Sequence, residues 1–410
     1  MKKAVLGTLA FLAVAAAFGY AVGETLYRPD RLWTLGFYAS LIELQLIALL
    51  LGLGMLLALG ARLIRPAARP FSVAAMVCLL ATLLPMVSAL RRPGNVKVEL
   101  AAFPRVLGDT REETNPRGPV VMYVVGDTGH APENSLKVAH GIAARAAQQV
   151  DPVVGTWLLG DLIEDRGGMG YERAKLECLA TPLRPVTDLG IPLFGILGNH
   201  DYEVGSALRM VDDPLLNMGG MNHYKRVIGD NLVSVFVVDS ETLRRQPEQV
   251  VWLHDAVATD KSRWRVLMMH HPPVGSDLFH GGNKFCLGAT ADAIYGTPGI
   301  DAVITGHNHF YERRNPIGNT TFITAGSGSR KPKRDLPPDA GRAAGLAGAN
   351  VFLEMAVDED DLSFRAFTRD GVEVDSFQIH RDMPDEHAKR LVPVAYRDSA
   401  SVEPAHPGDS

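Results

Sequence analysis

The stretch PVVMYVVGDTG, residues 119–129, indicates the fold class most directly, because a short apolar run ends there in glycine and aspartate. Its length and its β-branched residues predict a buried strand. A helical stretch follows at 134–148, and a second short apolar strand follows at 153–159. Such alternation of strands and helices is typical of a layered α/β or αββα domain.

The strand pattern continues along the chain and repeatedly ends in side chains that can bind metals. Further strands are predicted at 191–197, 232–238, 266–269, 302–305 and 321–324. Five strands of the whole set run into candidate ligands, which are, in chain order, Asp127, Asp161, Asn199 with His200, His270 with His271, and His307 with His309. One such residue at one strand end is usually structural, but five strand ends of this kind favour a common site.

The candidate ligands are expected to meet in space. The carboxyl ends of neighbouring strands in an open α/β sheet lie along one crevice, where such sheets bind their ligands. Carboxylate, amide and imidazole groups together suit first-row transition metals such as Mn, Fe or Zn. They suit neither a thiolate site nor an all-oxygen calcium site. The pattern therefore predicts a transition-metal site at the strand ends.

The composition of the 410 residues excludes several other classes. With 47% hydrophobic residues and 3 cysteines, the chain is not a disulfide-stapled miniprotein, a collagen-like fibre or a disordered protein. After residue 100 it holds 31 basic and 42 acidic residues, a balance of −11. A protein that follows a nucleic-acid backbone needs a basic surface, so no nucleic-acid partner is expected.

Three uncharged apolar runs precede the domain, at 4–23, 44–61 and 71–90. Each is close to the ~20 residues that span a bilayer, so residues 1–90 predict a membrane anchor of three helices. The first run also fits a signal peptide, with Lys2 and Lys3 as its basic start. In both interpretations the loop with Arg62, Arg65 and Arg69 is cytoplasmic. The following domain is then expected on the non-cytoplasmic side, periplasmic or extracellular.

Composition also sets the remaining boundaries. Residues 91–116 turn to proline, glycine and charge without a clear period, which predicts a linker. The folded catalytic domain is expected at 117–380. Residues 381–410 are polar and proline-rich, which predicts a disordered tail.

In their order and spacing, the motifs resemble those of the calcineurin-like metallophosphoesterases, and within them the purple acid phosphatases. The matching motifs are GDTG (126–129), GD (160–161), GNHD (198–201), an apolar strand ending in His270, and GHNH (306–309). NHY at 222–224 and HG at 280–281 look like the tartrate-resistant type, whereas HFYER at 309–313 looks like the plant type. The resemblance implies a four-layer αββα sandwich, here preceded by the N-terminal transmembrane helices.

By resemblance, the domain holds two transition metal ions, divalent or trivalent Fe, Mn or Zn. Asp161 would bridge them, Asp127 and His309 would hold one, and Asn199, His270 and His307 would hold the other. His271 also fits the family's His-x-Pro pattern, so the choice of His270 stays open. His200 and His280 would be catalytic, by stabilising developing charge or protonating the leaving oxygen.

One family ligand is missing from this sequence. The tyrosine that ligates iron in purple acid phosphatases falls on position 164, which is Glu164. Glu164, Asp165, His130 or water could take its place. Without a tyrosinate ligand we expect no purple charge-transfer colour, even with iron bound.

The resulting hypothesis is a membrane-anchored metallophosphoesterase that hydrolyses phosphomonoesters with a hydroxide activated at a dinuclear metal centre. Its partners would be a phosphate-ester substrate and the membrane. One alternative is a phosphodiesterase or pyrophosphatase that acts on nucleotide or lipid-linked substrates. A second is a catalytically impaired sensor domain, which the missing ligand keeps open.

Overall fold

The computed structural model describes residues 109–112, 117–164, 170–243, 246–275, 294, 297–330, 336, 338–381 and 389–394. All of them belong to the second of the two units into which the chain divides, residues 98–410. The predicted spans within 1–90, together with Asp165 and His280, lie outside the described residues. Within the described part, no helix has the length and apolar character needed to cross a membrane.

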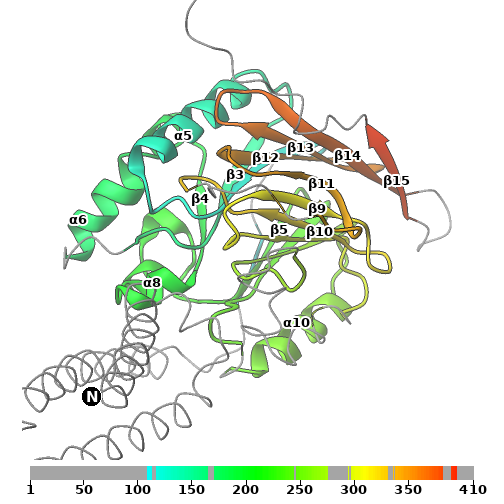
Figure 1. Ribbon diagram of the computed structural model, residues 1–410. Coiled ribbons are helices and arrows are strands. Elements are labelled where there is room, and N and C mark those ends of the chain that lie inside the picture. The colour runs from blue at the N-terminus through cyan, green and yellow to red at the C-terminus, as the bar shows by residue number, and fades with distance from the viewer. Residues whose placement is uncertain are drawn as a thin grey trace, which may run out of the picture. The chain divides into compact units, whose positions relative to one another are not determined.

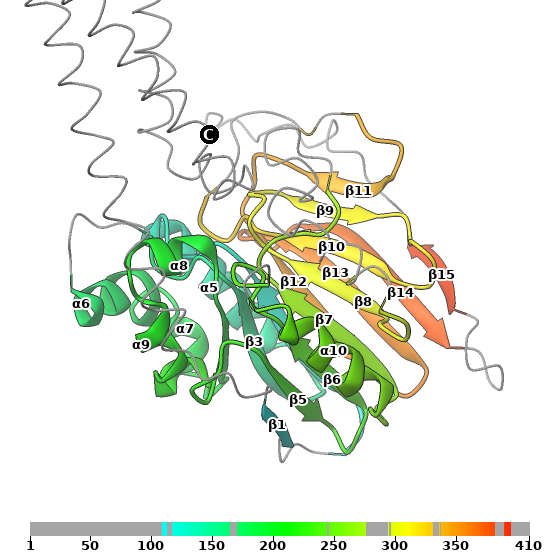
Figure 2. The same ribbon diagram turned by 90° about the horizontal axis from the view of Figure 1, so that it is seen from below.

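The domain is a mixed α/β sandwich of two sheets (Figures 1 and 2). The seven-stranded sheet has the order β15 (Lys389–Val394), β14 (Glu373–Arg381), β13 (Asp361–Thr368), β12 (Val351–Val357), β2 (Val120–Val125), β3 (Val153–Leu159) and β4 (Leu193–Ile196). Strands β2, β3 and β4 are parallel to one another, whereas β12 to β15 are antiparallel. The run quoted at the start of the sequence is β2, at the centre of this sheet.

The eight-stranded sheet supplies the other half. Its order is β1 (Asp109–Glu112), β5 (Tyr224–Ile228), β6 (Val233–Val237), β7 (Trp264–Met269), β8 (Ala302–Thr305), β10 (Thr321–Ala325), β9 (Tyr311–Arg314) and β11 (Arg342–Leu346). Strands β6, β7, β8 and β10 run parallel. Strand β1 lies in the segment predicted as a linker, and β15 lies in the segment predicted as a tail.

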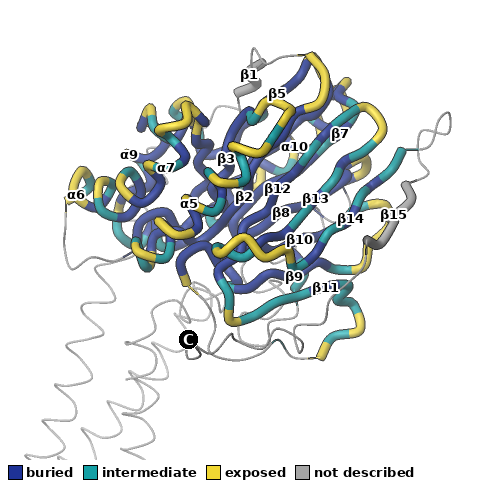
Figure 3. Tube along the Cα trace, turned by 90° about the horizontal axis from the view of Figure 1, so that it is seen from above, coloured by how far each residue is buried: buried dark blue, intermediate teal, exposed yellow. Residues whose placement is uncertain are grey.

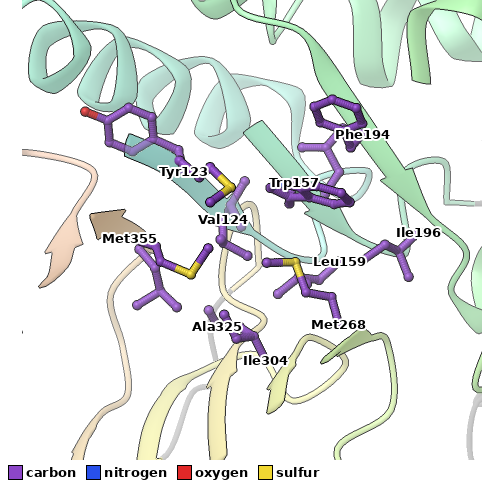
Figure 4. Close-up of a cluster of buried hydrophobic side chains, with 14 of the residues drawn as sticks. Tyr123, Val124, Trp157, Leu159, Phe194, Ile196, Met268, Ile304, Ala325 and Met355 are labelled. Atoms are coloured by element: carbon purple, nitrogen blue, oxygen red, sulfur yellow. The ribbon is translucent and has the colours of Figure 1, made fainter. Parts of the chain in front are cut away.

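The core between the sheets follows from the two-residue period of the strands. Val235 and Val237 of β6 belong to a core shared with the other sheet, whereas Phe236 between them belongs to a second core under a helix. In Figure 4, Met268 and Ile304 of the eight-stranded sheet meet Leu159 of the seven-stranded sheet. Both faces of these strands are buried, which explains their continuous apolar sequence.

Helices cover the outer faces of the two sheets. Helix α5 (Pro132–Ala146) buries Val138, Ala139 and Ile142 and contacts β12. Helix α10 (Glu248–Ala258) packs Leu253 into the core that contains Phe236. Shorter helical segments are α6 (Tyr171–Lys175), η2 (Leu176–Ala180), α7 (Arg184–Thr187), α8 (Asn199–Glu203), α9 (Ala207–Val211) and η3 (Pro214–Leu216). The strands that lead to the site are buried along their length (Figure 3).

Candidate metal centre

Two sheets, rather than one, position the candidate ligands. Asp127, Asp161 and Asn199 follow the parallel strands β2, β3 and β4 of the seven-stranded sheet. His270 and His307 follow the parallel strands β7 and β8 of the eight-stranded sheet. The carboxyl ends of both parallel sets meet, so the crevice predicted from the sequence lies across the two sheets.

Three of the candidate ligands have a strained backbone. Asp127, Asp161 and His307 have φ values of 59°, 55° and 65°, in the left-handed region that residues other than glycine rarely adopt. Left-handed residues of this kind concentrate at functional sites, where the surrounding structure holds them in place. At each of these strand ends the left-handed conformation turns the backbone sharply and directs the side chain into the site.

Four donor atoms form the centre of the site. Asn199 Oδ1 lies 3.2 Å from His270 Nε2 and 3.1 Å from His307 Nδ1, and these two ring nitrogens are 3.2 Å apart. Asp161 Oδ2 lies 3.3 Å from His270 Nε2. His270 Nδ1–H donates to the Leu159 carbonyl at 2.7 Å, so Nε2 is the nitrogen directed at the other donors. Backbone bonds of this type orient metal-binding histidines.

Asp127 and His309 form the adjacent part of the site. His309 Nε2 lies 3.3 Å from Asp127 Oδ1, and the His307 backbone N–H donates to Asp127 Oδ2 at 2.9 Å. Asp127 is fully buried, whereas 18% of the His309 side chain is exposed. This side of the site is therefore partly open to solvent through His309.

Burial and charge act on these groups in opposite directions. Burial raises the pKa of Asp127. Burial also opposes ionisation of Asp161, but the charges of His270 and His200 lower its pKa below the ordinary range. Burial disfavours the charged form of His270, yet Asp161 outweighs it and raises the His270 pKa to about 9. A metal at His270 Nε2 would therefore have to displace a proton.

His200 lies beside Asp161, at the start of α8. Its backbone N–H donates to Asp161 Oδ1 at 3.0 Å, and its Nε2 lies 4.0 Å from Asp161 Oδ2. Its Nδ1 lies 3.0 Å from Glu203 Oε2, one turn further along the helix. His200 thus presents one ring nitrogen to the cluster and fixes the other against Glu203.

The two neighbouring histidines after β7 have different surroundings. His270 faces Asp161, Asn199 and His307, as described above. His271 Nδ1 lies 3.0 Å from Ser240 Oγ, and the Ser240 hydroxyl also accepts from the His271 backbone N–H at 2.9 Å. The His271 ring packs on the His307 ring with centroids 4.4 Å apart. His271 is therefore held by Ser240 through hydrogen bonds, and its ring packs against His307.

Sequence reasoning missed Asp201 as a functional residue, although it quoted the motif that contains it. Asp201 is fully buried and accepts four backbone N–H bonds, at 2.8–3.0 Å, from Asp161, Leu162, Ile163 and Gly198. An acidic residue right after the Asn-His pair was the available signal. Asp201 fixes the loop that carries Asp161 to the helix that carries Asn199.

The donor set fits transition-metal ions. Three groups of buried or half-buried residues place ligand atoms within 4.8 Å of one another: His270, His271 and His307; Asp127, Asp161 and His270; and Asp161, Glu164 and His200. A buried cluster of carboxylates and facing imidazole nitrogens is unfavourable without a cation, because like charges and lone pairs face one another. Two adjacent metals sharing Asp161 fit this arrangement, and the metal's identity is not fixed by it.

A two-sheet sandwich with this donor set at its strand ends is the arrangement that the motifs led us to expect of a metallophosphoesterase. Residues 120–311 match the sequence model of the calcineurin-like phosphoesterase family. The resemblance identified from the motifs is thereby confirmed. A comparison with curated proteins found no match.

The fold is similar to that of a solved purple acid phosphatase structure. Purple acid phosphatase PPD1 from yellow lupin (Lupinus luteus) seeds aligns with a TM-score of 0.55 and 17% sequence identity, over 66% of this chain and 55% of the lupin chain. The alignment thus spans little more than half of the lupin protein. A dimetal phosphatase from Danio rerio aligns with a TM-score of 0.48 and 14% identity, over 64% of this chain and 98% of that chain. GAP50, the anchor in the inner membrane complex of Plasmodium, aligns with a TM-score of 0.49 and 12% sequence identity, over 70% of this chain and 93% of the GAP50 chain.

Proposed function

We propose that this chain is a membrane-anchored phosphomonoesterase with two metal ions at the strand ends. The observation that carries the proposal is the convergence of six side chains from five strand ends. They are Asp127, Asp161, Asn199, His270, His307 and His309. Two bound metals supply a water of lowered pKa and neutralise charge on the phosphoryl group.

The side chains of the protein then hold the metals and supply the proton for the leaving group. Asp161 is central to both halves of the cluster, so we assign it as the bridging ligand. Glu203 occupies Nδ1 of His200 at 3.0 Å, which leaves Nε2 to face the cluster. We assign this Nε2 as the atom that donates a proton to the leaving oxygen. By resemblance, His280 is a second proton donor.

The membrane part of the proposal is supported by the sequence alone. Three apolar runs precede the domain, and the arginine-rich loop between the second and third runs favours a cytoplasmic position for that loop. The catalytic domain would then act outside the cytoplasm. Alkaline extraction of membranes should leave the full chain in the membrane fraction, and protease added to the non-cytoplasmic side should cleave the domain. Release by alkali, or cleavage from the cytoplasmic side, would contradict this arrangement.

The activity is tested on the full chain, stripped of metal and reloaded with Mn, Fe or Zn. We expect metal-dependent hydrolysis of p-nitrophenyl phosphate, faster than that of bis-p-nitrophenyl phosphate. Asn199→Ala removes a central donor and should abolish both activities. Faster turnover of the diester would replace the monoesterase by a phosphodiesterase. Absence of turnover with every metal would favour a sensor domain.

A further inference from the structure

Glu164 is a buried acidic residue whose carboxylate is only half used. It lies in the loop after β3, three residues beyond Asp161, and is 8% exposed. Its Oε2 lies 2.5 Å from His130 Nδ1. Its Oε1 is buried and has no hydrogen-bond partner among the described residues. A buried carboxylate oxygen without a partner is strongly unfavourable. The burial of Oε1 therefore fits a positively charged ligand.

The surroundings of Glu164 identify that ligand as a cation shared with Asp161. Ligand atoms of Asp161, Glu164 and His200 lie within 4.8 Å of one another. Two buried carboxylates at this separation repel each other. His200 offsets only part of the negative charge of Asp161 and Glu164, because its Nδ1 already pairs with Glu203 at 3.0 Å. Oxygen donors on two carboxylates suit a divalent cation between them.

His130 holds Glu164 in this position. The His130 backbone N–H donates to Ser329 Oγ at 3.1 Å, and the Ser329 backbone N–H donates to the Asp127 carbonyl at 3.0 Å. The histidine is thus fixed to the same loop that carries Asp127. Its ring lies against Oε2 of Glu164 and leaves Oε1 without a partner among the described residues. Such an outer contact is the usual device that orients a carboxylate ligand.

We propose that Glu164 is a further metal ligand, which binds through Oε1 the cation that Asp161 holds, with His130 as the positioning residue. The proposal rests on the proposed metal centre but not on its activity. It assigns the ligand position for which the sequence left Glu164, Asp165, His130 and water as alternatives.

The experiment is a titration of the metal-stripped full chain with Co²⁺, followed by its visible d–d absorption and by the bound metal after dialysis. Glu164→Gln keeps the shape of the side chain and removes its charge. We expect one of two cobalt ions to bind at least about tenfold more weakly, with a changed absorption spectrum. His130→Ala should weaken the same ion less, because it removes only the positioning contact.

Asp361→Asn is the matched control, since Asp361 also pairs with a histidine, His380, at 2.8 Å but belongs to none of the three groups of candidate ligands. Its cobalt affinity should stay within about twofold of the parent protein, as expected for a change outside the ligand set. If Glu164→Gln does not fold, Glu164→His serves instead, and it should bind two cobalt ions with an altered spectrum.

The proposal is overturned if Glu164→Gln binds two cobalt ions with the parent affinity and spectrum, or if Asp361→Asn weakens binding equally. A parent chain that binds no cobalt also overturns it. Cobalt binding that depends on Glu164 in a chain that hydrolyses no phosphoester would overturn the proposed function and support the ligand assignment. The two proposals can therefore fail separately.

Discussion

The backbone N–H of Asp161 donates a hydrogen bond to Asp201 Oδ2 at 3.0 Å. Through this bond, and through three further N–H groups on the same carboxylate, the loop after β3 is attached to helix α8. The loop carries Asp161 and the helix carries Asn199. The distance between two candidate ligands is therefore set by a residue that need not touch a metal itself.

Asp201→Asn should impair both the fold and the activity. The amide offers one acceptor oxygen, and its NH₂ group would face backbone donors. Each buried N–H left without an acceptor destabilises the fold by about 1–3 kcal/mol. We expect a Tm lower by several degrees and turnover of p-nitrophenyl phosphate lower by at least about tenfold. Thermal melts and kinetics test this, with the exposed Asp188→Asn as control. Parent-like values for Asp201→Asn would refute the positioning role.

Gly198→Ala should move Asp161. The glycine ends the turn after β4, and a Cβ at this position would overlap the Asp161 carboxylate. A displacement of about 1 Å at a catalytic group can lower the rate by about 100-fold. We expect a loss in kcat of that order. Gly170→Ala is the matched control, because no atom of the described residues lies within 4 Å of its Cβ position. Equal activity of the two variants would show that the close approach is unimportant.

His270 and His271 should differ in their effect on bound metal. His270→Ala removes a donor directed at Asp161, Asn199 and His307, so metal content after dialysis should fall by one ion and activity by at least about 100-fold. His271→Ala removes a side chain bound to Ser240, so both metals should remain, with an affinity lower by less than about tenfold. If His271→Ala loses the ion and His270→Ala keeps it, the two roles must be exchanged.

His223 makes the stability of the fold depend on pH. The residue is 4% exposed and packs against Trp252, and burial lowers its pKa from 6.5 to about 4. Between these values the unfolded chain binds a proton that the folded chain does not. Stability therefore falls as pH falls through this window, by about 3 kcal/mol for this group once pH 4 is passed.

His223→Phe keeps a ring against Trp252 and removes the titration. The free energy of unfolding, measured with urea from pH 7 to pH 4, should fall less steeply in this variant than in the parent chain. Because other groups titrate in the same range, the difference between the two curves is the relevant quantity. Identical slopes would mean that His223 is protonated in the folded state.

Much of the fold could be predicted from local sequence. The strands at the centre of each sheet are apolar on both faces, so they stand out as short runs: β2, β3, β4, β6, β7, β8 and β10 all lie within or overlap predicted strands. Strands β12 to β14 were not predicted. Strand β12 pairs with β2 across more than 200 residues of chain, from Val351–Val357 to Val120–Val125. No local pattern reports such a pairing, because it depends on how distant segments pack.

The site shows the same division. Strand ends followed by Asp127, Asp161, Asn199, His270 and His307 predicted which residues would meet, since the carboxyl ends of parallel strands share an edge. Sequence did not distinguish His270 from His271, because both follow one strand and both fit the motif. Their surroundings differ through residues from other parts of the chain, such as Leu159 beside His270 and Ser240 beside His271.

The sequence by itself determined the family, the order of the strands in the chain and the residues that end them, because these depend on short-range periodicity and residue type. The tertiary structure alone decided that the ligands come from two sheets, that Asp201 joins two of the ligand segments, and that Glu164 lies near Asp161 and contacts His130. Those relationships are contacts between side chains and backbone far apart in the sequence. They exist only after both sheets have packed on their common core.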